Sequence, residues 1–171
     1  MIDDYDLTNL KNDKKKRTNS KAKGSRFERK IASLLNNRLN TKEFSRTPGS
    51  GAFATSHNLP DYLKIYGDLI APKGFKYCIE CKKGYKNIKI NNILDYSSQL
   101  WKFIEQCEKD SLKCGKEPML LMQQDRQPTL AFIKRNMDEG KIKNYAILCE
   151  YKMVLFDDLL EIWDDSDWFT P

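Results

Sequence analysis

The segment from residue 67 to residue 82, GDLIAPKGFKYCIECK, constrains the fold of this chain more than any other stretch. Two short apolar runs flank the turn-forming cluster Pro72–Gly74, so the sequence predicts a tight β-hairpin. Asp68 and Glu80 stand at equal separations along the chain from the glycine of this turn. In a hairpin centred on that glycine, the two carboxylates face each other with Cβ atoms about 5 Å apart. The segment therefore predicts a pair of facing acids on one small patch.

Alternation along the second arm adds a lysine to this pair. Successive side chains of a strand point to opposite faces, which places Glu80 and Lys82 together and leaves the other face apolar, with Phe75, Tyr77, Ile79 and Cys81. Two facing carboxylates repel each other unless a cation lies between them, and hard divalent metals choose carboxylate oxygens. Acids and lysines are also common on the solvated face of a hairpin. The apolar surroundings favour a metal site, because acids buried in a sheet are costly unless they are paired or metal-bound.

Length and composition predict one soluble domain. A chain of 171 residues can bury a single core. No apolar run approaches the roughly 20 residues of a membrane span, and no secretory segment follows Met1, so a cytoplasmic protein with no membrane partner is expected. Five cysteines without a regular framework fit a reducing compartment. The spacing Cys78-x-x-Cys81 is typical of a zinc or redox motif. Both interpretations are disfavoured here, because positions i and i+3 of a strand point to opposite faces.

Charge is divided unevenly along the chain. Residues 153–171 contain six acidic side chains and no lysine or arginine, whereas the preceding residues carry all 30 basic side chains against 18 acidic ones. A basic body is typical of a protein that binds a polyanion, most simply nucleic acid, although basic surfaces are also ordinary solvated surfaces. Residues 1–24 are rich in lysine and poor in apolar residues, which predicts a flexible basic tail. This tail either follows phosphates or only adds solubility.

Periodicity along the rest of the chain predicts helices and strands in turn. A helix is expected from Ser25 to about Arg38, with Glu28 at the margin of its apolar stripe as either a rim residue or a ligand. A Pro-Gly-Ser-Gly loop after Arg46 allows backbone amides to approach a phosphate, but no Walker sequence follows. Later elements are expected as a helix from about 91 or 93 to 108, strands at 118–124, 129–134 and 145–151, and an acidic helix at 156–163. This order predicts a mixed α/β sheet flanked by helices, in a single domain over residues 25–171.

Three sequence blocks resemble the core of the PD-(D/E)xK nuclease superfamily, which has the general form E…D…ExK. Glu28 on the first helix, the dipeptide Gly67-Asp68 and the tripeptide Glu80-Cys81-Lys82 follow this form in order. The chain departs from the motif at one position, because Gly67 stands where the motif has proline. Acids and lysines are frequent in proteins, so the order of the three blocks carries more weight than any one of them.

Within this superfamily the chain is most similar to the archaeal and phage Holliday junction resolvases. Residues 23–29, KGSRFER, resemble the KGxxxER start of those enzymes. Residues 46–51, RTPGSG, resemble their Ser/Gly loop before the first acid of the hairpin. The resemblance covers about residues 23–83, and the second half of the chain adds a compatible order of helix and strands.

The resemblance implies a restriction-endonuclease-like fold and a metal-dependent endonuclease that hydrolyses phosphodiester bonds in DNA. It assigns Mg²⁺, with Mn²⁺ as a substitute, to Asp68, Glu80 and the backbone carbonyl of Cys81, while Glu28 contacts the metal or its waters. Lys82 is expected to orient or help to deprotonate the attacking water and to stabilise the transition state. The residues expected to contact nucleic acid are Arg29, Arg46, Ser50, Gln99 and Lys83.

Three functions remain open for this set of residues. A Holliday junction resolvase of phage or archaeal type, acting in DNA recombination, requires a homodimer so that two sites nick opposing strands of branched DNA. A restriction-type or general DNA endonuclease uses the same residues with another recognition surface, although the sequence lacks a clear helix-turn-helix. A non-catalytic nucleic-acid-binding module carries the same acids as surface residues. The resolvase-like blocks favour the first function.

Overall fold

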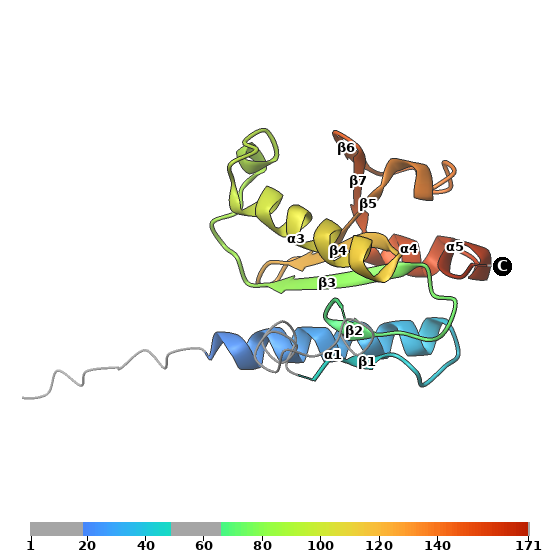
Figure 1. The fold of residues 1–171 in the computed structure, drawn as a ribbon. Helices are drawn as coiled ribbons and strands as arrows, with labels where there is room; N and C mark the ends of the chain where they lie inside the picture. The colour runs from blue at the N-terminus through green and yellow to red at the C-terminus, as the bar shows by residue number, and fades with distance from the viewer. Residues whose placement is uncertain (1–18, 49–65, 171) are drawn as a thin grey trace, which may run out of the picture.

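The computed structural model describes residues 19–48 and 66–170, which form a mixed β-sheet with helices on both faces. Figure 1 shows α3 on one side of β3 and α1 on the other, as the sequence predicts for a sheet flanked by helices. Within these two ranges no helix combines the length and the apolar character needed to cross a membrane. The elements in chain order are α1 (Ser20–Arg38), β1 (Ser45–Arg46), β2 (Leu69–Ile70), β3 (Tyr77–Lys83), η2 (Ile90–Ile93), α3 (Gln99–Cys114), β4 (Glu117–Gln123), β5 (Thr129–Lys134), η3 (Arg135–Met137), β6 (Ala146–Leu148), β7 (Tyr151–Leu155), α4 (Phe156–Ile162) and α5 (Asp165–Trp168).

The main sheet has five strands in the order β3-β4-β5-β7-β6. β3 and β4 are parallel, whereas the other neighbouring strands are antiparallel. A parallel pair requires a crossover connection, and α3 provides it. β3 is therefore an edge strand of this sheet, with a long helix over each face. Its register places Glu80 beside Leu120 and Lys82 beside Met122 of the buried strand β4.

The predicted hairpin is present as a turn but not as a pair of strands. The chain turns at Pro72, where the Phe75 amide donates to the Pro72 carbonyl at 3.2 Å. Before the turn, β2 pairs with β1, with Leu69 opposite Arg46, and after the turn β3 pairs with β4. The predicted pairing of the two arms is therefore wrong. Alternation of apolar residues identifies a buried strand, but it does not select the partner of that strand.

α1 is the predicted amphipathic helix, but it begins earlier than predicted. Asn19 is its N-cap, and the Asn19 side chain accepts a hydrogen bond from the Ala22 amide at 3.2 Å. The helix consequently starts at Ser20 rather than near Ser25, and the end of the predicted tail is helical. Residues 1–18 of that tail lie outside the described residues. The apolar stripe is buried against the sheet, with Phe27, Ile31, Ala32 and Leu35.

Side chains alternate along β3 as predicted, and this alternation divides the core between two faces. Tyr77, Ile79 and Cys81 lie in the cluster that contains the apolar stripe of α1. Glu80 and Lys82 point to the other face, where both contact a side chain of α3. The α3-side cluster contains residues from α3 and from four strands, among them Leu100, Phe103, Ile104, Leu120, Met122, Phe132, Leu148 and Tyr151.

The second half of the chain follows the predicted order with two differences. Residues 145–151, predicted as one strand, contain a turn at Cys149 with φ +52°, which joins β6 to β7. The helix predicted to start near residue 91 or 93 starts at Gln99 and extends to Cys114, after the short turn η2. Both errors have the same cause, because apolar periodicity continues through a tight turn without marking it.

The acidic C-terminal segment packs into the α1-side core through two tryptophans. Trp163 and Trp168 are fully buried, and Trp163 stacks on Tyr77 with ring centroids 5.6 Å apart. The guanidinium of Arg38 on α1 donates to the carbonyls of Leu160 and Trp163. The acidic side chains of α4 and α5 remain exposed or half-buried on the outer surface. This segment therefore completes the core with its apolar face.

Candidate active site

Asp68 is held against the outer edge of β3 by backbone contacts. Its amide donates to the Ile79 carbonyl at 2.8 Å, and its carboxylate accepts from the Cys81 amide at 2.8 Å. Gly67 permits this close approach, because it adopts φ +77° and a Cβ atom there would lie 2.8 Å from the Ile79 carbonyl oxygen. Glycine in place of the motif's proline is thus a steric requirement of this site.

The contacts of Asp68 to residues 79 and 81 lie on either side of Glu80. The two acids are thereby brought to the same part of β3, as the sequence predicts, although no regular strand ladder joins them. Both carboxylates are buried, with 8% of Asp68 and 4% of Glu80 exposed. Burial, and after it the charge of Asp68, raises the pKa of Glu80 to about 7, against an opposing effect of Lys82.

Lys82 and a glutamine of α3 hold the Glu80 carboxylate. The Lys82 ammonium donates to Oε1 of Glu80, and the Gln106 amide donates to the same oxygen at 2.8 Å. Lys82 also donates to Oε1 of Gln106 at 3.1 Å and lies 4.9 Å from the centroid of the Phe103 ring. Burial alone lowers the pKa of Lys82, but the charge of Glu80 more than offsets this, so the net pKa is raised. Lys82 is therefore a cation at neutral pH.

Glu28 reaches the same region from α1. It is buried, and Nε of Arg46 donates to its carboxylate. Burial, and after it the charge of Asp68, raises the pKa of Glu28, while Arg46 lowers it by a smaller amount. Asp68 therefore acts electrostatically on both Glu28 and Glu80, and three buried acids share one edge of the sheet.

These three acids suit a hard divalent cation. They are oxygen donors, they are buried, and the repulsion from Asp68 that raises two of their pKa values is relieved by a cation. Within residues 19–48 and 66–170, no three His, Cys, Asp or Glu side chains already form a metal cage. In this structure Arg46 pairs with Glu28 and Lys82 pairs with Glu80. The metal assignment stays a prediction.

Cys81 can contribute to such a site only through its backbone. Burial raises the pKa of the Cys81 thiol far above its ordinary value, which keeps the sulfur protonated and a poor metal ligand. In a strand, the amide and the carbonyl of one residue point to the same edge, and the Cys81 amide bonds to Asp68. The Cys81 carbonyl therefore lies on the edge occupied by Asp68, where the sequence prediction requires it.

The predicted nucleic-acid contacts have different environments. Arg29 is exposed on α1, and Gln99 is exposed at the start of α3. Arg46 is engaged with Glu28, and Lys83 donates to Oε1 of Gln123 at 2.7 Å. The remaining predicted contact, Ser50, lies outside the described residues. These roles stay predictions.

Two polar residues near the acids were missed by the sequence reasoning. Gln106 contacts both Glu80 and Lys82, whereas the sequence reasoning selected Gln99, seven residues earlier on the same helix face. Helical periodicity identifies the face but not the turn that meets β3. Thr47 is buried, its amide donates to the Asp68 carbonyl at 2.9 Å, and its hydroxyl has no hydrogen-bond partner among the described residues. No pattern in the sequence distinguishes Thr47 from other loop threonines.

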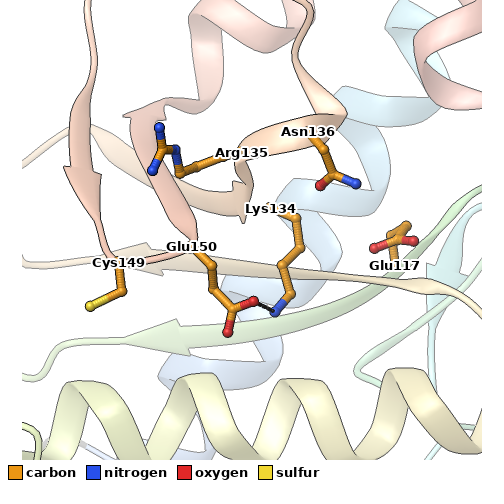
Figure 2. Close-up of a pocket in the computed structure, with 6 residues that line it drawn as sticks. All are labelled: Glu117, Lys134, Arg135, Asn136, Cys149 and Glu150. Atoms are coloured by element: carbon orange, nitrogen blue, oxygen red, sulfur yellow. Dashed lines mark ion pairs between the residues drawn. The ribbon is translucent and has the colours of Figure 1, made fainter.

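A separate pocket lies at the opposite end of β4 from this site. It is lined by Glu117, Lys134, Arg135, Asn136, Cys149 and Glu150, which Figure 2 shows. Lys134 donates to Glu108 at 2.8 Å and pairs with Glu150 at 2.8 Å, so its charge is balanced by α3 and the β6–β7 turn. None of the predicted catalytic residues lines this pocket, and its ion pairs serve to join α3 to the sheet.

Comparison with known proteins gives a family match, a curated relative and a similar solved structure. The model of the family described as "Phage putative PDDEXK endonuclease" matches residues 19–159. Protein D14 of Escherichia phage T5 is 31% identical over 153 residues, which cover 84% of this chain and 91% of that protein. Among solved structures, Hjc of Archaeoglobus fulgidus, a Holliday junction resolvase, aligns with 78% of this chain and 89% of its own, at 17% identity and a TM-score of 0.38.

Proposed function

The chain belongs to the phage PD-(D/E)xK endonuclease family, and we propose that it is a metal-dependent endodeoxyribonuclease that resolves four-way DNA junctions as a homodimer. One observation carries the catalytic part of the proposal. Three buried acids, Glu28, Asp68 and Glu80, converge with Lys82 on one edge of the sheet, and the charges of two of them are destabilised by the third. Burial of like charges close together is costly, and a divalent cation between them relieves the repulsion.

We assign each residue of the site the role that the family resemblance implies, and the contacts support this assignment. Asp68, Glu80 and the Cys81 carbonyl would hold a divalent ion, Mg²⁺ or Mn²⁺, and Glu28 would bind it or its waters. When bound, such an ion would supply Lewis-acid chemistry, lowering the pKa of the attacking water and neutralising charge on the scissile phosphate. Lys82 is charged at neutral pH, so it orients the attacking water and stabilises the negative charge that develops on the phosphate.

The junction preference rests on the two resolvase-like blocks, residues 23–29 and 46–51. A resolvase must place two sites on opposing strands, and a symmetric dimer is the simplest assembly that does so. The same catalytic residues serve a general endonuclease equally well, so the substrate must be tested separately from the chemistry. We expect the protein to act inside the cell, where four-way DNA junctions are processed.

The test is a cleavage assay with matched substrates. Purified protein is incubated with a labelled four-way junction, a flap, single strands and a linear duplex of the same sequence, with Mg²⁺ or with EDTA, beside Glu80→Gln. Paired symmetric nicks near the branch point that require both Mg²⁺ and Glu80 support the resolvase. Equal cutting of the linear duplex contradicts the junction preference and leaves a general endonuclease. Binding without cleavage under any metal contradicts catalysis altogether.

A further inference from the structure

Four lysines gather around the end of β3, immediately beyond the catalytic segment. Lys83 is the last residue of β3, and its environment includes the positive charges of Lys23 and Lys30 on α1. Lys23 lies against Gly84, with its ammonium 3.2 Å from the position of a Cβ atom there. Lys86 follows on the exposed segment after the strand. We call Lys23, Lys30, Lys83 and Lys86 the lysine cluster.

One carboxylate is placed among these lysines. Asp125, in the turn between β4 and β5, forms an ion pair with Lys23 and a second with Lys86 at 3.7 Å. The hydrogen bond from Lys23 and the charges of Lys23, Lys86 and Lys83 hold the pKa of Asp125 below its ordinary value. Asp125 is partly exposed, so another anion can approach the same lysines from solvent.

The turn that carries Asp125 is braced on both sides. The Gln124 amide donates to the carbonyls of Tyr85 at 3.0 Å and Ile88 at 2.6 Å, which ties the turn to the segment after β3. The Gln123 amide donates to the Gln127 carbonyl at 2.9 Å, which closes the turn itself. The position of Asp125 among the lysines is therefore set by the fold rather than by the ion pairs alone.

The lysine cluster is continuous with the candidate active site. Lys83 is next to Lys82 in β3, although its side chain points to the α1 face, where its ammonium lies 5.7 Å from the centroid of the Phe27 ring. Tyr85 is 41% exposed and packs edge-on against Phe103, with ring centroids 4.6 Å apart, and the Lys82 ammonium lies over the same Phe103 ring. Lysines and one exposed aromatic ring therefore lie beside the catalytic edge, which is the composition that nucleic-acid backbones favour.

We propose that the lysine cluster binds the phosphate backbone of DNA and that Asp125 occupies the cluster in the free protein in place of a phosphate. The inference rests on the proposed function, because it takes DNA as the partner. A carboxylate that neutralises Lys23 and Lys86 reduces the number of counterions that DNA can release, and it repels an incoming phosphate. Asp125 thus weakens binding to any DNA that cannot displace it.

The test measures DNA binding in EDTA, where no cleavage interferes. Asp125→Asn is expected to tighten the dissociation constant for a short labelled duplex by about fivefold at low salt, and to steepen the plot of log affinity against log salt by about one unit. The matched control is Glu150→Gln, which removes one negative charge and one ion pair with a lysine at the distant pocket. The control should bind as the wild type does, and thermal melting should show both variants folded.

A second pair of variants tests whether the gain comes from the released lysines. In the double variant Lys23→Gln with Lys86→Gln, adding Asp125→Asn should give less than half of the gain seen with both lysines present. Equal affinities of Asp125→Asn and Glu150→Gln would overturn the inference, as would a gain that persists in full without the two lysines.

The outcome is separable from that of the proposed function. Tighter binding by Asp125→Asn in a protein that leaves all DNA intact with Mg²⁺ would retain the lysine cluster and overturn catalysis. Cleavage that depends on Glu80, together with an unchanged affinity of Asp125→Asn for DNA, would retain the proposed catalysis and overturn the role of Asp125 in the lysine cluster.

Discussion

Two buried carboxylates of this protein each pair with a lysine, yet their charges are balanced differently. Asp138 accepts from Lys152 at 2.7 Å, from the Ile142 amide at 3.3 Å and from the Trp163 indole at 3.3 Å. Although burial raises its pKa, these hydrogen bonds more than offset the effect, so the pKa of Asp138 is lowered. Glu80 also has a lysine partner, but its pKa is raised to about 7 by burial and by the nearby charge of Asp68.

The difference separates a structural ion pair from a candidate functional site. Asp138 is surrounded by donors, and its ionised form is the favoured one. Glu80 shares its surroundings with Asp68 and Glu28, and the negative charge of Asp68 raises the pKa of both glutamates. Burial of like charges close together is costly to the fold. A divalent ion bound between these acids relieves their repulsion, which makes the edge of β3 the place to test for chemistry.

The largest expected effect is the loss of cleavage on neutralising an acid at this edge. Asp68→Asn or Glu80→Gln removes a metal ligand, and the rate of DNA cleavage should fall by about three orders of magnitude or more. DNA binding in EDTA should be preserved, because neither residue lies in the lysine cluster. Glu117→Gln, a half-buried acid at the other end of the sheet, is the control that should keep full activity. Wild-type turnover by either of the first two variants would contradict the site assignment.

Replacing the lysine of the site should cost nearly as much. Lys82→Ala removes the cation that stabilises charge on the phosphate, and the single-turnover rate is expected to fall by about a hundredfold to a thousandfold without loss of fold. Lys83→Ala, the neighbouring lysine on the other face of β3, should weaken DNA binding while leaving the rate at saturating DNA unchanged. A small effect of Lys82→Ala on the rate would remove this lysine from the mechanism.

The structural pair should respond in stability instead of activity. Asp138→Asn leaves Lys152 buried with a neutral partner, so the free energy of unfolding should fall by about 3 kcal/mol in urea denaturation. Glu80→Gln should leave the free energy of unfolding unchanged or higher, because it removes a buried charge that the fold does not fully balance. The reverse order of stabilities would contradict the distinction between the two sites.

A smaller effect is expected at the glutamine that supports Glu80 and Lys82. Gln106→Ala should slow cleavage by about tenfold, because residues that orient metal ligands contribute at roughly this level. Gln99→Ala, on the same face of α3, should change the rate less than Gln106→Ala does. A larger loss for Gln99→Ala would show that the α3 contact to the site lies at the start of the helix instead.

The pH dependence of stability gives the mildest test, in metal-free protein. The pKa of Glu80 is raised from an ordinary 4.5 to about 7, so between these pH values the folded state binds more protons than the unfolded state. The free energy of unfolding should therefore fall as the pH rises from 4.5 to 7. Glu80→Gln should show a smaller fall over the same range, and an identical fall in both proteins would mean that Glu80 titrates normally.

Patterns local in the sequence determined much of this protein. The apolar stripe of α1, the alternation along β3 and the order of helices and strands all follow from side-chain periodicity, which each segment carries by itself. The three motif blocks, which contain Glu28, Asp68 and Glu80–Lys82, likewise predicted that the chain belongs to the PD-(D/E)xK nucleases. The family match over residues 19–159 confirms this membership.

Tertiary structure decided which segments meet. β2 pairs with β1 rather than with β3, Gln106 rather than Gln99 reaches Glu80, and Asp125 arrives beside Lys23 from the opposite half of the chain. The sequence predicts an acidic helix at 156–163, whereas only the fold shows that Trp163 and Trp168 complete the core on the α1 side of the sheet. Periodicity states which face of an element is buried, whereas its partner depends on the packing of all the other elements at once, and no single segment encodes that.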